Sequence, residues 1–246
     1  MSQIKNYERF KELYKDKKYA LAYAMSTKFP KLQESTEFVK MEKNFQTSFE
    51  NAQKLILLNL PDQAKDQISK YITVLSKRDL LQLVINNNEY FKNFLLAYNN
   101  DDFVRCYEIS DKHTNIKLLK ISILLEAHWD KLIAECELYA TQGNINGLKR
   151  TLGDLIHITS RADKIGDLLR LSFHIKIKQL LNEESFKRAE MLIYSYVDIF
   201  GINTDIKDLM IKFEKSSSTI LAITHQKEKV SKYAWRDSEL IMSFDS

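Results

Sequence analysis

Arg150 and His157 are the two residues whose types and spacing could support catalysis. They stand seven positions apart, so an unbroken helix would present both side chains on one face. An arginine and a histidine that reach the same phosphate could cleave a phosphodiester bond. This chemistry requires both side chains in one cleft, within hydrogen-bond or one-water reach of that phosphate.

This Arg-x6-His spacing resembles the nuclease pair of HEPN-type helical domains, in which an arginine and a histidine lie near the scissile phosphate. Thr151 stands where that family usually has a polar residue after the arginine. The resemblance implies an alternative function, a HEPN-like helical ribonuclease that uses Arg150 and His157. The competing interpretation, which we favour, is two unrelated polar residues on a helix surface.

Metal, cofactor and nucleophile chemistry find little support in the sequence. No two of the five histidines show the i, i+4 spacing that places two imidazoles on one metal from a single helix. Cys106 and Cys136 align with alanines in the repeat described below, so we expect them to be small buried packing residues. No serine or cysteine has a convincing base partner. We therefore expect no metal site, no cofactor and no enzymatic activity.

The charge pattern gives only weak support for a nucleic-acid partner. The chain has 37 Lys and Arg against 33 Asp and Glu, a net charge of +4, and the two signs alternate along it. The short basic clusters are Lys15-Lys17-Lys18, the pair Lys176 and Lys178, and Lys227-Lys229-Lys232. A helical-repeat nucleic-acid-binding protein is a second alternative, which would need these lysines to merge into one stripe. The aromatic residues lie on core stripes instead of beside the basic residues, which disfavours it.

The amino-acid composition predicts that the candidate residues named above all lie on helices or in the turns between helices. Five Gly and two Pro among 246 residues are too few for the tight turns of β or doubly wound folds, so we expect an all-α protein. The longest apolar runs, such as Leu55 to Leu58, are too short for a membrane span. The polar N-terminus and the two cysteines favour a cytoplasmic location. The predicted helices cover 2–15, 18–29, 35–59, 62–75, 78–98, 101–111, 115–142, 145–160, 163–182, 184–200, 204–225 and 227–241, with a break at Asn86-Asn87-Asn88.

An internal repeat organises these helices. A shift of 84 positions aligns Ala22 with Cys106 and Phe45 with Trp129, and a shift of 83 positions then aligns Cys106 with Ala189. Three tandem units of about 82 positions each account for the chain, at about 1–84, 85–167 and 168–246. Each unit would contain two helical hairpins.

A single hairpin cannot bury both of its apolar stripes, whereas stacked hairpins bury a continuous core. We therefore expect one right-handed α-solenoid of about six hairpins over 1–246. The small residues at shared repeat positions, and the Tyr/Ala pattern of Lys15 to Met25, resemble the tetratricopeptide-like superfamily. The resemblance is architectural, because the period is nearer 41 than 34 and the family signature is absent. It implies a protein-binding surface.

Two candidate interfaces follow. Asn44, His128 and Lys212 each stand directly before an aromatic core residue of their unit, so we expect a polar ladder along the concave groove. The competing interface is the apolar C-terminal helix within 227–246, where Tyr233 and Trp235 either cap the array or dock a partner.

The sequence therefore predicts a non-enzymatic protein–protein interaction scaffold or adaptor. Its partner would be another protein, bound by the groove or by the C-terminal helix, and self-association through the solenoid ends stays open. The long first helices and the Lys/Asn/Ile-rich usage resemble helical-repeat scaffolds around bacterial flagellar motors. This likeness implies a place in a larger bacterial assembly such as a motility apparatus.

Overall fold

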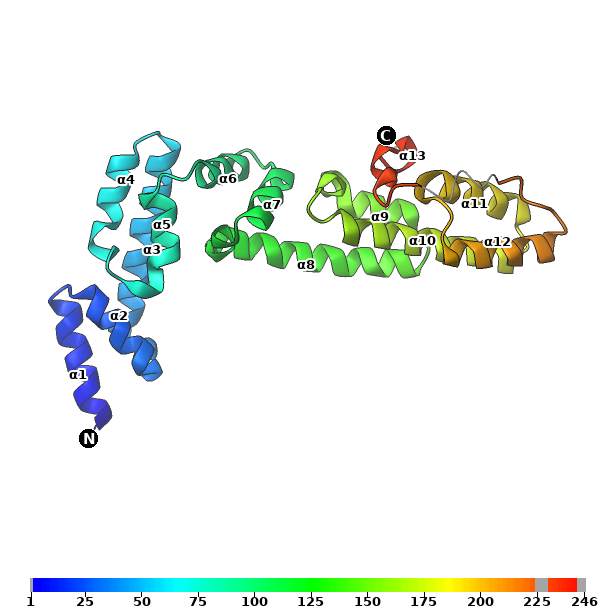
Figure 1. The fold of residues 1–246 in the computed structure, drawn as a ribbon. Helices are drawn as coiled ribbons and strands as arrows, with labels where there is room; N and C mark the ends of the chain where they lie inside the picture. The colour runs from blue at the N-terminus through cyan, green and yellow to red at the C-terminus, as the bar shows by residue number, and fades with distance from the viewer. Residues whose placement is uncertain (1, 224–229, 243–246) are drawn as a thin grey trace. The chain divides into compact units, whose positions relative to one another are not determined.

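The structure is a computed structural model of the chain, and it describes residues 2–223 and 230–242. These residues contain only helices and the turns between them, and none of them forms a strand (Figure 1). The predicted all-α class is therefore confirmed. The chain divides into two compact units, Met1–Ile123 and Leu124–Ser246. This division does not coincide with the repeat boundaries expected near 84 and 167.

The first unit is a series of paired helices. It contains α1 (Ser2–Lys15), α2 (Tyr19–Lys28), η1 (Pro30–Glu34), α3 (Thr36–Leu57), α4 (Pro61–Ile68), η2 (Ser69–Tyr71), η3 (Leu75–Lys77), α5 (Arg78–Ile85), α6 (Glu89–Asn99), α7 (Phe103–Lys112) and η4 (Thr114–Leu118), where η marks a 3-10 helix. Helix α1 packs on α2, α3 on α4 and α6 on α7. Helix α8 (Lys120–Thr141) begins in this unit and continues into the second.

The second unit has longer helices, and the described residues 230–242 pack against them. It continues with α9 (Ile145–Leu152), η5 (Gly153–His157), α10 (Ala162–Asn182), α11 (Phe186–Phe200), α12 (Thr204–Ser217), η7 (Ala234–Asp237) and α13 (Glu239–Met242). Helices α10, α11 and α12 pack on one another, and η7 contacts α11.

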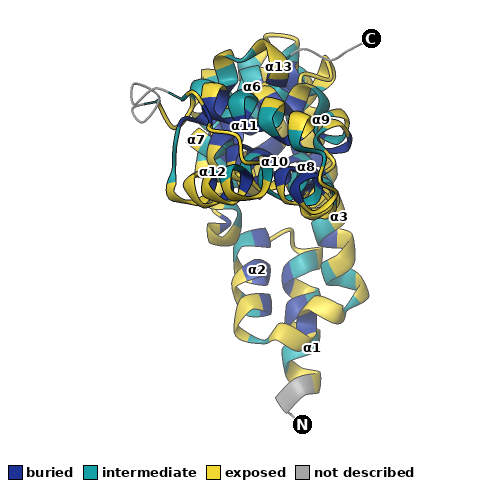
Figure 2. Ribbon diagram, turned by 90° about the vertical axis from the view of Figure 1, so that its right-hand side faces the viewer, coloured by how far each residue is buried: buried dark blue, intermediate teal, exposed yellow. Residues whose placement is uncertain are grey.

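Helix α3 shows why these segments form amphipathic helices. Its apolar stripe of Met41, Phe45, Phe49, Ala52 and Ile56 is buried, as the period of three and four residues predicts. A serine directly before the helix accepts a hydrogen bond from a first-turn amide and caps its N-terminus. Figure 2 shows buried and exposed residues alternating along α1 and α2.

Element bounds recur along the chain at a fixed offset. Helices α2, η1, α3 and α4 have the same bounds as α7, η4, α8 and α9 after a shift of 84 positions. Helices α11 and α12 begin 83 and 84 positions after α7 and α8. These are the offsets on which the predicted repeat rests.

Left-handed turns recur at the same offsets. The turns after α1, α6 and α10 place Lys17, Asp101 and Glu184 at φ values of 57°, 55° and 56°. The turns after α3 and α8 place Asn59 and Gly143 at 60° and 67°. A Cβ costs about 1–2 kcal/mol in this region, which glycine avoids. The chain contains only five glycines, so most of these turns use a side-chain-bearing residue.

A cation in the first unit joins three elements of the core. Lys77 Nζ, at the end of η3, lies 2.9 Å from Glu42 Oε1 on α3. The same ammonium lies 4.7 Å from the centre of the Phe45 ring and 5.3 Å from that of Tyr23 on α2. One lysine thus fixes α2, α3 and η3 by charge and by cation–π contact.

The second unit contains the counterpart of this cluster, 84 positions later in the sequence. Arg161, directly before α10, places its NH2 atom 2.6 Å from Glu126 Oε1 on α8. Its guanidinium carbon lies 4.6 Å from the centre of the Trp129 ring. Trp129 is buried, as the repeat alignment predicts. The same combination of a cation, a carboxylate and an aromatic ring therefore holds α3 in the first compact unit and α8 in the second.

Several predicted helix boundaries were wrong because local backbone signals intervene. The expected helix 62–75 ends as α4 at Ile68 and passes into 3-10 structure. The expected helix 204–225 ends as α12 at Ser217, because Ser218 adopts a left-handed φ of 58°. The predicted break at Asn86-Asn87-Asn88 is confirmed, and Asn87 has a φ of 48°.

Buried tyrosines make the fold sensitive to alkali. Burial raises the pKa of Tyr71 to about 12 and that of Tyr196 to about 12, from 10.0. The folded chain therefore keeps protons that the unfolded chain releases, so the stability present below pH 10 is lost as the pH rises towards 12. We expect the free energy of unfolding, measured by urea titration, to fall by about 1–3 kcal/mol between pH 9 and pH 11. Tyr71→Phe should reduce this loss, and an unchanged loss would assign the effect to other groups.

Candidate functional site

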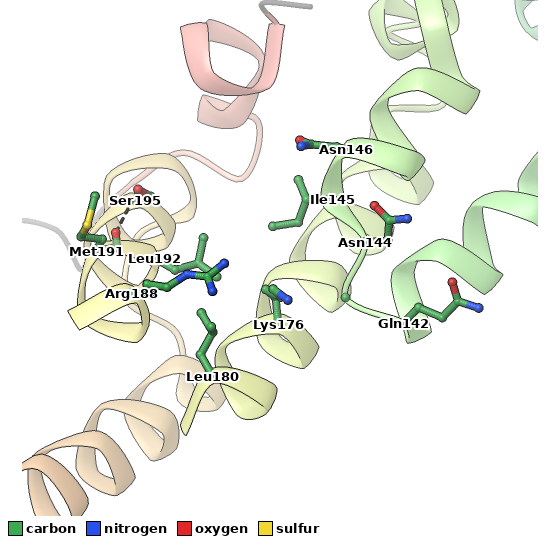
Figure 3. Close-up of a pocket in the computed structure, with 11 residues that line it drawn as sticks. Gln142, Asn144, Ile145, Asn146, Lys176, Leu180, Arg188, Met191, Leu192 and Ser195 are labelled. Atoms are coloured by element: carbon green, nitrogen blue, oxygen red, sulfur yellow. Dashed lines mark hydrogen bonds between the residues drawn. The ribbon is translucent and has the colours of Figure 1, made fainter. Parts of the chain in front are cut away.

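A cavity of about 510 Å³ opens on the second unit between the turn after α8, helix α10 and helix α11. It is lined by Gln142, Gly143, Asn144, Ile145, Asn146, Lys176, Leu180, Arg188, Met191, Leu192 and Ser195, all of which belong to this unit. Its volume lies within the range of about 300–1,000 Å³ that is usual for binding pockets. Figure 3 shows Ile145 and Asn146 on one wall, facing Leu192 and Arg188 on the other.

The turn that forms one wall is held close to α10. A Cβ on Gly143 would lie 2.9 Å from the main-chain nitrogen of Lys176, a distance that a real Cβ essentially never shows. The carbonyl oxygen of Gln142 accepts a hydrogen bond of 2.9 Å from Gln179 Nε2 on α10. Glycine at 143 therefore satisfies both the left-handed φ and the close approach.

Two cations give the cavity its charge. Lys176 reaches it from α10 and Arg188 from α11. Neither side chain has a hydrogen-bond or ion-pair partner among the described residues, and no acidic residue lines the cavity. Apolar side chains surround the two cations: Ile145, Leu180, Met191 and Leu192. Met191 is 64% exposed. The arrangement can bind a carboxylate or another anion that carries an apolar group beside it.

In the first unit, the turn equivalent to that of Gly143 already holds a lysine. Lys92, on α6, donates a hydrogen bond from its Nζ to Asn59 Oδ1 in the turn after α3. Asn59 stands 84 positions before Gly143. Because glycine has no side chain to accept this bond, the donors of Lys176 stay available to a ligand.

Arg188 shows the same contrast. Arg105 stands 83 positions earlier and lines a pocket of the first unit together with Glu108. At the position of Glu108 the second unit has Met191. The acid that lines the pocket of the arginine in one unit is thus replaced by an uncharged thioether in the other. Sequence reasoning noted Lys176 as part of a solvated basic pair and missed the cavity. The replacement of Asn59 by Gly143 and of Glu108 by Met191 at repeat positions was a usable signal.

The expected polar ladder does not coincide with this cavity. Asn44, His128 and Lys212 are all exposed, as a groove would require. Asn44 belongs to the first unit, whereas His128 and Lys212 belong to the second. Lys212 Nζ donates to Asn182 Oδ1 at 3.4 Å. None of the three lines the cavity, so their role in binding stays a prediction.

The helix that would unite Arg150 and His157 is absent. Helix α9 ends at Leu152, because Gly153 adopts φ +50° and ψ −138°, and His157 lies in the 3-10 helix η5. The seven-residue spacing therefore does not place the two side chains on one α-helical face. The expectation of a continuous helix over 145–160 was wrong, and Gly153 was the signal in the sequence that should have ended it.

The C-terminal prediction also needs correction. The chain does not form a continuous helix over 227–241. Its described part contains η7 and the four-residue α13, and 224–229 and 243–246 lie outside the described residues. Trp235 is fully buried and Tyr233 is 45% exposed. While this segment is seated, Trp235 cannot contact a partner, because it already fills the core of its own unit.

The two cysteines are buried, and the described histidines form no metal-binding cluster with one another or with acidic residues. Cys106 and Cys136 are fully buried, and burial raises the pKa of the first thiol to about 12 and of the second to about 11. His174 stacks on Tyr196 with 4.8 Å between ring centres, and burial lowers its pKa. Within 2–223 and 230–242, no three His, Cys, Asp or Glu side chains cluster as metal ligands would.

Comparisons with family models, with curated proteins and with solved structures found no match to this chain. The tetratricopeptide-like resemblance therefore rests on the sequence pattern alone. In the part of the chain that the structure describes, no helix combines the length and the apolar character that crossing a membrane requires.

Proposed function

We propose that this protein is a non-enzymatic interaction scaffold built from tetratricopeptide-like helical repeats, and that the cavity of its second unit docks an acidic segment of a partner protein. The recurring element bounds, left-handed turns and cation clusters support a repeat array. We expect this array to form a right-handed solenoid, in which stacked hairpins bury a continuous core. A place in a larger bacterial assembly and a cytoplasmic location remain predictions from the sequence.

The observation that carries the proposal is the uncompensated charge of Lys176 and Arg188 within an apolar rim. An acidic side chain of the ligand supplies the missing counter-charge, and an adjacent aliphatic or aromatic side chain covers Leu192 and Met191. In the first unit Asn59 accepts a hydrogen bond from Lys92, and Glu108 lines the pocket that contains Arg105, so we expect binding to be a property of the second unit.

The test uses a fluorescein-labelled peptide of about twelve residues that alternates Glu with Leu and Phe. Binding to the full chain is followed by fluorescence anisotropy. We expect the double variant Lys176→Glu with Arg188→Glu to bind at least about tenfold more weakly, because attraction becomes repulsion. Binding by the natural chain should also weaken as salt rises from 50 to 300 mM, since both cations are accessible to solvent.

Lys178→Glu with Lys187→Glu is the matched control. These lysines lie on the same two helices, are exposed and do not line the cavity, so the control makes the same change in net charge. We expect it to retain most of the affinity. Equal losses in both double variants would reduce the effect to net charge and overturn the proposal. So would failure of the natural chain to bind the acidic peptide better than a version with Lys in place of Glu.

A further inference from the structure

The end of the chain is bound to the second unit as a separate short segment. Residues 230–242, the docked segment, are joined to α12 by residues that form no described helix. Trp235 and Ile241 are fully buried, whereas Tyr233 and Leu240 stay about half exposed. The segment therefore holds on by two apolar anchors that are six residues apart.

The seat of Trp235 is a notch in helix α10 that only glycine provides. A Cβ on Gly166 would lie 2.8 Å from Trp235 Nε1. Glycine in the middle of a helix is destabilising relative to alanine, so a structural reason is needed for its presence there. Room for the indole supplies that reason. The notch is a preformed site for a large aromatic side chain.

Two polar contacts near the notch are made to main-chain carbonyl oxygens of the docked segment. Arg170 NH2 donates to the carbonyl oxygen of Lys232 at 2.9 Å, and Lys149 Nζ donates to that of Leu240 at 2.6 Å. Main-chain carbonyls are common to every peptide, so these contacts would hold any segment that follows the same path.

Side-chain contacts add specificity at the two sides of the tryptophan. Arg236 NH2 donates to the carbonyl oxygen of His157 at 3.1 Å and to Thr159 Oγ1 at 2.9 Å. Lys232 Nζ lies 2.7 Å from Asp163 Oδ1, and both side chains are more than half exposed. Exposed ion pairs exchange readily with water and hold little on their own.

The docked segment is an imperfect occupant of its seat. Trp235 Nε1 is buried and has no hydrogen-bond acceptor among the described residues. A buried N–H group without an acceptor forfeits the hydrogen bond that it makes to water when released. This loss favours release and offsets part of the gain from burying the ring.

We propose that this notch is a second docking site, for a partner segment that carries a tryptophan next to a basic residue and an aliphatic residue six positions later. The chain's own docked segment covers the site and must leave before the partner binds. This site is independent of the acidic-peptide cavity, because none of the residues that hold the docked segment lines that cavity.

The probe is a fluorescein-labelled peptide with the sequence of residues 230–242, added to the full chain and followed by anisotropy. In the natural chain the docked segment competes with it. In Trp235→Ala the seat is vacated, so the peptide should bind at least about tenfold more tightly. A peptide with alanine at the tryptophan position should not bind. Gly166→Leu, added to Trp235→Ala, should abolish binding by filling the notch.

Arg236→Ala is a milder variant that leaves the core intact and should give an intermediate affinity, which keeps the test valid if Trp235→Ala unfolds. Equal binding to the natural chain, Arg236→Ala and Trp235→Ala would show that the peptide does not bind in the notch, and would overturn the proposal. Concentration-dependent dimers of the natural chain that Trp235→Ala abolishes would identify a second copy as the occupant, and would also overturn it.

Discussion

Replacing Trp129 with alanine should lower the free energy of unfolding by about 3–5 kcal/mol, the range for a large aromatic residue removed from a packed core. The indole is only 8% exposed and it carries the guanidinium of Arg161 on its face. Truncation leaves a cavity beneath α8. It also removes the aromatic ring on which the Arg161 guanidinium lies while it pairs with Glu126. The effect is measured by urea denaturation followed by circular dichroism.

Two further variants serve as the matched core comparison and the exposed control. Phe45→Ala removes the equivalent ring of the first unit, which is 2% exposed, and should cost a similar amount. Leu124→Ala changes a residue that is 59% exposed on the same helix as Trp129, and should cost less than about 1 kcal/mol. A loss for Trp129→Ala no larger than that for Leu124→Ala would show that Trp129 contributes little to the core.

Gly143→Ala should lower the free energy of unfolding by about 2–5 kcal/mol, the sum of two costs. A Cβ at φ +67° adds about 1–2 kcal/mol of backbone strain. The same Cβ would lie 2.9 Å from the main chain of α10, so the turn or the helix must move, which typically costs a further 1–3 kcal/mol or so. Chemical denaturation of the full chain measures the sum.

Asn59→Ala is the control that carries neither cost. Asn59 has the same left-handed conformation, φ 60°, in the equivalent turn, and its backbone already accommodates a Cβ. The change removes only the exposed hydrogen bond to Lys92, so we expect a loss below about 1 kcal/mol. If both variants cost the same, neither the left-handed conformation of Gly143 nor its close approach to α10 accounts for the loss.

Local patterns were sufficient to predict the elements whose apolar faces are buried within one hairpin. The stripe of α3 and the small residues at 22, 106 and 189 carry that information directly, because burial is periodic along each helix. The interruption at Asn86-Asn87-Asn88 was also readable, since asparagine tolerates a left-handed φ and favours helix ends.

The C-terminal segment could not be predicted in the same way. Its apolar residues suggest a helix, but its conformation is set by contacts with α10 and η5, which lie far away in the sequence. Gly166 gives no local sign that it receives an indole. The cavity had a similar problem, because Lys176 and Arg188 come from different helices and their lack of partners is a property of the folded chain.

The left-handed turns have a consequence for how this protein could change under selection. Lys17, Asp101 and Glu184 occupy a conformation that glycine would adopt without strain, and none of them is buried. Each is therefore a position where one substitution can raise thermal tolerance without touching the core, the cavity or the docked segment. A laboratory selection for heat resistance should enrich glycine at these three turns first. The stability gained there would allow the binding surfaces to accumulate substitutions that the present chain could not tolerate.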